Sequence, residues 1–145
     1  MLVHCSFSKK ALAESGTARM RTYMSYKKGD VVVVKFPFIL KDGAAVIQKG
    51  RPAFVISDDK IKRRYKDVVL TAITSQIPRD IMELEIVLER TISNGLVKRS
   101  LLRLDFIMTV PEELISRKIG ILPKSVVKES ERRLKQLLGF ELISV

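Results

Sequence analysis

The feature that most constrains the fold of this chain is a change in hydrophobic periodicity near residue 123. Before it, apolar residues occur in short runs that are rich in β-branched side chains or alternate with polar ones, and Gly, Pro, Asn and Asp separate the runs. Such runs are typical of β-strands. From residue 123 to residue 139, apolar residues recur at helical spacing instead. Several short strands followed by one helix predict a small α+β fold with a barrel-like sheet.

Six segments have the pattern of strands, and we expect five to seven short strands that pair mostly antiparallel. Residues 81–89 show the alternation of a half-buried strand. The run at 67–76 is continuously apolar near its start, which predicts burial on both faces. Residues 39–50 and 58–66 are expected to be loops, and Asn94-Gly95 marks a turn. The expected strands are residues 30–38, 51–57, 67–76, 81–89, 100–110 and 116–122.

Residues 123–139 predict one amphipathic helix. Pro123 suits the start of a helix because its missing N–H would have no helical partner there, and Gly139 suits the end. One face carries charged residues, and we expect the apolar face to pack on the core or on a second copy of the chain. The apolar face holds Val126, Val127, Ser130, Leu134, Leu137 and Leu138.

The first 25 residues differ from the rest of the chain. They are polar and show no sustained period, so we expect a tail or a fraying helix over residues 1–25. Residues 26–145 are then expected to form one domain. Met20 and Met24 are alternatives to Met1 as the start of translation.

The charge of the chain restricts the partners that it suits. Its 27 Lys and Arg residues exceed its 16 Asp and Glu residues by 11, which favours nucleic acid or an acidic protein as partner. No apolar run approaches the roughly 20 residues of a membrane helix. Residues 1–7 do not have the pattern of a secretory signal, and a single Cys cannot form an internal disulfide. We therefore expect a soluble, cytoplasmic protein.

Four short clusters, in this order and in strand context, resemble one protein family. They are Gly29-Asp30 before a Val-rich run, Gly50-Arg51-Pro52 before an apolar run, residues 72–76 (AITSQ), and Arg103-Leu104-Asp105. Together they are similar to the MazF/PemK/Kid family of toxin endoribonucleases, over roughly residues 26–140. The resemblance implies an SH3-like β-barrel, a homodimer, cleavage of single-stranded RNA without a metal or cofactor, and an acidic antitoxin as partner.

RNA cleavage by the 2′-hydroxyl requires a base for its proton, stabilisation of the phosphorane charge and a proton for the leaving 5′-oxygen. A histidine pair is excluded because His4 is the only histidine. Arg51 suits the phosphorane oxygens through its planar, permanently charged guanidinium. The hydroxyl of Thr74 can contact a phosphate or bond a backbone group in a turn.

Arg103 and Asp105 share one face of the strand predicted at residues 100–110. One interpretation of this pair is a structural salt bridge. The other follows the resemblance, which implies that Asp105 accepts the 2′-hydroxyl proton and that Arg103 assists the phosphate or the leaving oxygen. The candidate catalytic residues are therefore Arg51, Thr74, Arg103 and Asp105.

RNA-binding candidates lie outside this set. Gln76 shares a strand face with Thr74 and can contact a base edge. Two basic segments suit RNA phosphates, and Tyr65 offers a ring for base stacking, although solvated loops have the same composition. The residues of these segments are Lys62, Arg63, Arg64, Tyr65, Lys98 and Arg99.

A second function is consistent with the same sequence. Phe106 and Met108 stand where the family has polar residues, and the segment before Arg51 is altered as well. These differences leave open a non-catalytic member of the same fold that binds RNA or a protein target, as the gyrase-poison branch of the family does.

Overall fold

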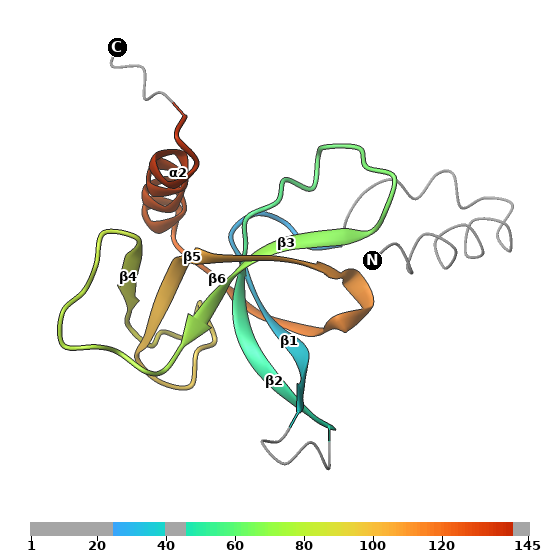
Figure 1. The fold of residues 1–145 in the computed structure, drawn as a ribbon, viewed down its shortest axis with the longest axis horizontal. Coiled ribbons are helices and arrows are strands. Elements are labelled where there is room, and N and C mark those ends of the chain that lie inside the picture. Colours follow the sequence, from blue (N-terminus) through green and yellow to red (C-terminus); the bar gives the residue numbers. More distant parts are fainter. Residues whose placement is uncertain (1–24, 40–45, 141–145) are drawn as a thin grey trace, which may run out of the picture.

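The computed structural model describes residues 25–39 and 46–140. They form one twisted sheet of six strands and a long helix near the C-terminal end (Figure 1). The strands are β1 (Asp30–Ile39), β2 (Val46–Val55), β3 (Asp67–Thr74), β4 (Glu85–Leu88), β5 (Ser100–Pro111) and β6 (Ile115–Ile121). A single 3₁₀ turn, η2 (Glu112–Leu114), joins β5 to β6, and the helix is α2 (Lys124–Leu138).

Every strand pair is antiparallel, and the strand order is β4-β5-β3-β2-β1-β6. The α+β class, the number of strands and the C-terminal helix are confirmed for the described residues. The barrel is not confirmed, because β4 and β6 are the two ends of the order and do not pair. The loop after β4 nevertheless reaches the other end of the sheet, where the Ile121 N–H donates to the Ser93 carbonyl (2.9 Å).

Two strand boundaries differ from the predictions. β2 begins at Val46, within the segment predicted to be a loop, and ends at Val55. Gly50 and Pro52 favour a loop by propensity, but residues 46–52 pair only with β1, and a segment with one neighbour tolerates proline. β4 covers only Glu85–Leu88 of the strand predicted at residues 81–89, and Met82 is exposed before it.

The sheet carries a hydrophobic cluster on each face. Alternation along β1 sends Val32 and Val34 to one cluster and Val31 to the other. The prediction that β3 is buried on both faces holds in part, because its residues alternate between buried and half-buried. The first cluster holds Val32, Val34, Ala53, Val55, Val68, Leu70, Val110 and Ile115. The second holds Val31, Phe54, Ile73, Leu88, Leu96, Leu102, Leu104 and Leu122.

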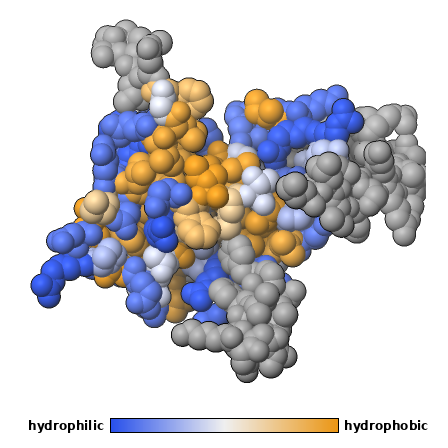
Figure 2. All heavy atoms as spheres, in the orientation of Figure 1, coloured by the Kyte–Doolittle hydropathy of each residue, from blue (hydrophilic) through white to orange (hydrophobic). Residues whose placement is uncertain are grey.

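Helix α2 covers the second cluster. Val126, Val127 and Leu134 pack against it, as the apolar face predicts. Pro123 precedes the helix and Gly139 ends it in the left-handed region (φ 77°), which confirms both predicted ends. Leu137 and Leu138, at the end of the same face, are exposed instead. Figure 2 shows apolar surface gathered over α2 and the part of the sheet beside it.

The predictions for residues 1–24, including the start sites, lie outside the described residues. Within the described part of the chain, α2 is the only α-helix, and no helix is long and apolar enough to cross a membrane.

The buried Thr71 of β3 yields a stability prediction. Thr71 lies next to a register shift between β3 and β5, and its hydroxyl is shielded from solvent and has no hydrogen-bond partner among the residues that the structure describes. Valine has the same shape without the polar group, so Thr71→Val should raise the free energy of unfolding by about 1 kcal/mol. Urea unfolding followed by circular dichroism measures this change, with the exposed Thr109→Val as the control. A loss of stability in Thr71→Val alone would contradict the prediction.

Candidate functional site

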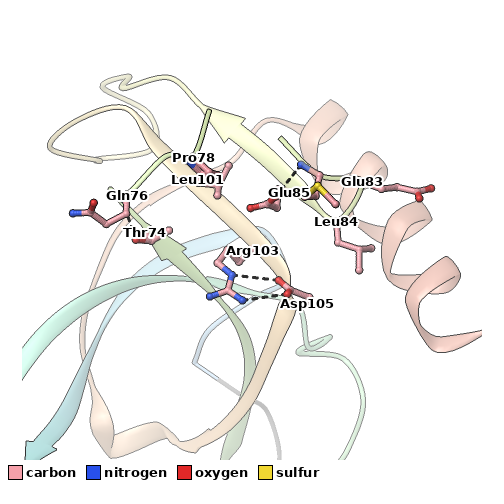
Figure 3. Close-up of a pocket in the computed structure, with 10 residues that line it drawn as sticks. Thr74, Gln76, Pro78, Glu83, Leu84, Glu85, Leu101, Arg103 and Asp105 are labelled. Carbon is pink, nitrogen blue, oxygen red and sulfur yellow. Dashed lines mark hydrogen bonds and ion pairs between the residues drawn. The ribbon is translucent and has the colours of Figure 1, made fainter. Parts of the chain in front are cut away.

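An open groove of about 620 Å³ lies at the end of β3, between β5 and the segment that leads into β4 (Figure 3). The register sets its floor, because Thr74 lies opposite Leu101, and Arg103 lies opposite Ala72 on one side and Glu85 on the other. Cross-strand partners point to the same side of a sheet. The groove is lined by Thr74, Gln76, Pro78, Met82, Glu83, Leu84, Glu85, Leu101, Arg103 and Asp105.

The groove floor lies on the face of the sheet that α2 does not cover. Ala72 pairs with Arg103 on one side and with Ala53 on the other, and Ala53 belongs to the first cluster. Leu102 and Leu104 point the opposite way, into the cluster beneath α2, as the alternation of β5 predicts. The helix therefore leaves the Arg103–Asp105 face open to a ligand.

Arg103 and Asp105 form a two-point ion pair at the groove. Arg103 Nη2 lies 3.1 Å from Asp105 Oδ2, and Arg103 Nε lies 3.4 Å from Asp105 Oδ1. The guanidinium carbon also sits 5.4 Å from the centre of the Phe106 ring. The two side chains are 40% and 43% exposed, and ion pairs this exposed contribute only about 0–1 kcal/mol to stability. The pair is therefore a weak structural element, which leaves both groups accessible for chemistry.

Thr74 and Gln76 lie beside this pair, where β3 ends. The Gln76 N–H donates to Thr74 Oγ1 (3.1 Å), which is the turn contact that the sequence left open for this hydroxyl. A hydroxyl that accepts one hydrogen bond still carries its own proton and can donate it to a phosphate oxygen. Figure 3 shows Thr74 and Gln76 on the β3 side of the groove, across from the Glu85 side.

Arg51 is the predicted catalytic residue that does not line the groove. It is exposed on β2, opposite Val34 of β1, and two residues before the segment of β2 that pairs with β3. The structure thus brings Thr74, Arg103 and Asp105 together and places Arg51 outside the lining.

The predicted basic loop lies at the other end of β3. Lys62, Arg63, Arg64 and Tyr65 precede Asp67, where β3 begins, and the neighbouring Lys66 carbonyl accepts from the Glu112 N–H (2.9 Å). Asp67 and Thr74 are the two ends of β3, which places them about 23 Å apart. The loop is therefore not part of the groove.

The second basic segment lies nearer to the groove. Lys98 and Arg99 directly precede β5 and are both exposed. Arg99 Nε lies 2.8 Å from Glu89 Oε1 in an exposed ion pair. Because Leu101 lines the groove two residues later, these cations flank the start of β5 beside it.

The wall of the groove opposite β3 could not be predicted from the sequence. Pro78, Met82 and Leu84 supply apolar surface there, and Glu83 and Glu85 add carboxylates. The alternation of residues 81–89 had placed Glu83 and Glu85 only on the solvent-facing side of a half-buried strand. With Asp105, three acidic residues line a groove whose lining has one basic residue, Arg103, although the whole chain carries a net charge of +11.

The family of the chain follows from comparison with known proteins. Residues 27–138 match the model of the PemK-like, MazF-like toxins of type II toxin-antitoxin systems. Comparison with curated proteins gives no match.

Solved structures share the fold at low sequence identity. The Mycobacterium tuberculosis toxin MazF-mt6 is 17% identical, with a TM-score of 0.60, over 78% of this chain and 99% of that one. A MazE-MazF structure from Deinococcus radiodurans is 19% identical, with a TM-score of 0.64, over 80% and 97%. An endoribonuclease in complex with its cognate antitoxin, from a mycobacterial species, is 15% identical, with a TM-score of 0.62, over 82% and 100%. The match over 27–138 shows that this chain belongs to the PemK-like, MazF-like toxin family of type II toxin-antitoxin systems.

Proposed function

We propose that this toxin is a metal-independent endoribonuclease that cleaves single-stranded RNA and leaves 2′,3′-cyclic phosphate and 5′-hydroxyl ends. The observation that carries the proposal is the exposed Arg103–Asp105 pair beside Thr74 in an open groove. A carboxylate, a guanidinium and a hydroxyl within one groove are the groups that this reaction uses. The family and the mycobacterial endoribonuclease of the same fold support it.

The proposed reaction assigns one role to each group. Asp105 accepts the proton of the 2′-hydroxyl, and the 2′-oxygen then forms a bond to phosphorus. The bond from phosphorus to the 5′-oxygen breaks, that oxygen takes up a proton from water, and Asp105 returns the proton that it accepted to the solvent. Arg103 stabilises the negative phosphorane, because its five N–H donors allow it to contact both Asp105 and a phosphate. Thr74 donates its hydroxyl proton to a phosphate oxygen.

The charge of the groove indicates which part of the RNA enters it. The carboxylates of Asp105 and Glu85 face the groove and repel a phosphate, so the reacting phosphate belongs at Arg103, the cation of the lining. A base suits the interior, because Pro78, Met82 and Leu101 can contact its apolar faces. The carboxylate of Glu85 points toward the groove, whereas Glu83 points away from the ion pair (Figure 3). Carboxylates accept from the amino groups of bases, and we propose a preference for bases that carry one over uracil.

The positive groups outside the groove have a different proposed role. Arg51, Lys98, Arg99 and the loop at residues 62–65 attract the RNA backbone and contact flanking nucleotides. The net charge of +11 also suits an acidic partner. By analogy with the Deinococcus radiodurans MazE-MazF structure and the mycobacterial complex, we propose an acidic antitoxin that inhibits the toxin, and a toxin homodimer.

Incubation of the purified protein with a long single-stranded RNA in excess chelator tests the function. We expect discrete cuts with cyclic-phosphate ends, a base with an amino group enriched at one position beside the cut, and inhibition by an acidic partner protein. RNA that is bound but uncut would contradict catalysis and favour the binding module. Cuts with no base preference would contradict only the assignment of the groove interior.

A further inference from the structure

The β4 side of the groove is an edge of the sheet, and a side chain of α2 forms hydrogen bonds to it. β4 has four residues and pairs only with β5. The Leu104 N–H donates to the Leu84 carbonyl (2.9 Å), so the Leu84 carbonyl points toward β5. Glu83 and Leu84 belong to a turn before β4, in which the Glu85 N–H donates to the Met82 carbonyl (3.1 Å). The Glu85 carbonyl, next after that of Leu84, points to the outer edge, because successive carbonyls along a strand point to opposite sides. Such edge carbonyls need a partner, and a short edge strand is readily displaced.

Arg133 of α2 supplies that partner. Its Nη1 donates to the carbonyl of Glu83 (2.8 Å) and to that of Glu85 (2.9 Å). Helix α2 covers the opposite face of the sheet, so this side chain reaches around the β4 edge to make both bonds. The guanidinium takes the place that a seventh strand would occupy.

Arg133 is itself held in this position. Its Nε donates to Glu129 Oε1 (2.8 Å), one turn earlier in α2, and its side chain is only 23% exposed. Hydrogen bonds from Arg132 and Arg133 lower the pKa of Glu129 to about 2. Glu129 therefore remains a carboxylate in mild acid as well as at neutral pH and keeps its three hydrogen bonds from the two guanidinium groups.

The two hydrogen bonds from Arg133 to the Glu83 and Glu85 carbonyls, called the tether below, act on the wall of the groove that faces the Arg103–Asp105 ion pair. Glu83, Leu84 and Glu85 line the groove, and Glu85 is the direct cross-strand partner of Arg103. We propose that Arg133 is a positioning residue that fixes the β4 wall of the groove against Arg103 and thereby sets the rate of RNA cleavage. The effect on the cleavage rate rests on the proposed function. The effect on the position of the β4 wall rests only on the hydrogen bonds of Arg133.

The experiment compares Arg133→Ala with Arg132→Ala in the full-length protein. Arg132 also bonds Glu129 and is 48% exposed. Its charge attracts that of Glu83, but its hydrogen bonds go to Glu129 and Gln136 and not to the Glu83 or Glu85 carbonyl, so it is a matched loss of one guanidinium. The single-turnover cleavage rate and the KM for a short single-stranded RNA are measured, with hydrogen exchange of the amides at residues 82–88. We expect Arg133→Ala to reduce the rate about tenfold and to speed this exchange, because small displacements at a site are costly.

The two controls define the remaining outcomes. Arg132→Ala should stay within about twofold of the wild type in rate and leave the exchange unchanged, since it leaves the tether intact. Arg133→Lys should restore part of the cleavage rate, because an ammonium can still donate to the two carbonyls. If Arg133→Ala does not fold, Arg133→Lys replaces it as the test variant, with a smaller expected loss of rate.

Three results would overturn the inference. They are a wild-type rate in folded Arg133→Ala, an equal loss in Arg132→Ala, or unchanged exchange at residues 82–88 in Arg133→Ala. If the wild-type protein leaves RNA intact, the proposed function fails, and the exchange measurement still decides whether Arg133 holds the wall.

Discussion

Replacing Arg103 with alanine should reduce the RNA cleavage rate at least about hundredfold, and the thermal unfolding temperature should change little. The loss follows from the removal of a preorganised cation at the point where the phosphorane charge develops. The small effect on stability follows from the exposure of the Arg103–Asp105 pair. Arg103→Lys should recover only part of the rate, because an ammonium cannot bind Asp105 and a phosphate with a planar fork.

Asp105→Asn tests the other half of the pair. An amide has nearly the shape of the carboxylate but cannot accept the 2′-hydroxyl proton, so we expect a loss of about a hundredfold to ten-thousandfold. Single-turnover rates on a defined RNA measure both variants. Lys28→Ala, which removes an ion pair with Glu131 on α2, away from the groove lining, is the control for the loss of a surface cation. Full activity of Asp105→Asn would exclude Asp105 as the base, and full activity of Arg103→Ala would remove the phosphorane assignment.

Replacing Gly120 with alanine should destabilise the fold by about 3 kcal/mol or more. A Cβ at this position of β6 would overlap the backbone of Ser93 and Asn94. Backbone atoms cannot move aside as a flexible side chain does, so β6 and the loop after β4 would have to separate. This separation would strain the hydrogen bond from Ile121 to Ser93, which links the two ends of the sheet.

Gly139→Ala is the matched control for this prediction. Gly139 has a positive φ of 77°, but a Cβ there would meet nothing within 4 Å, so alanine should cost only about 1 kcal/mol. Urea unfolding of both variants measures the difference. Equal and small losses in the two variants would show that the close approach of β6 to the loop does not constrain the fold.

The sequence predicted the elements well where the signal is local. The Val-rich run and the amphipathic pattern after Pro123 depend only on neighbouring residues, and both became elements close to the predicted bounds. The start of β2 was predicted wrongly because Gly50 and Pro52 weaken a strand by propensity, while pairing with β1 stabilises it there. The strand predicted at residues 81–89 is longer than β4, because the alternation of apolar and polar residues continues beyond the residues that pair with β5.

For the candidate site, too, the sequence predicted what depends on neighbouring residues and not what depends on contacts between strands. Alternation alone predicted that Thr74 and Gln76 share a face, and that Arg103 and Asp105 share another, because side chains along a strand repeat every second residue. Only the register of β3 and β5, which shifts between the pairs Thr71–Ile107 and Ala72–Arg103, joined the two pairs of site residues in one groove. Whether these residues carry catalysis remains a prediction.

The sequence by itself determined the α+β class, the strand-rich body and the helix with its ends, because propensity and periodicity act within a few residues. The tertiary structure decided which face of the sheet stays open, which carboxylates line the groove, and that Arg51 and the loop at residues 62–65 lie outside it. It also decided the bonds of Arg133 to the carbonyls of Glu83 and Glu85. These contacts join residues about 50 positions apart, so they depend on strand register and helix packing rather than on any local pattern.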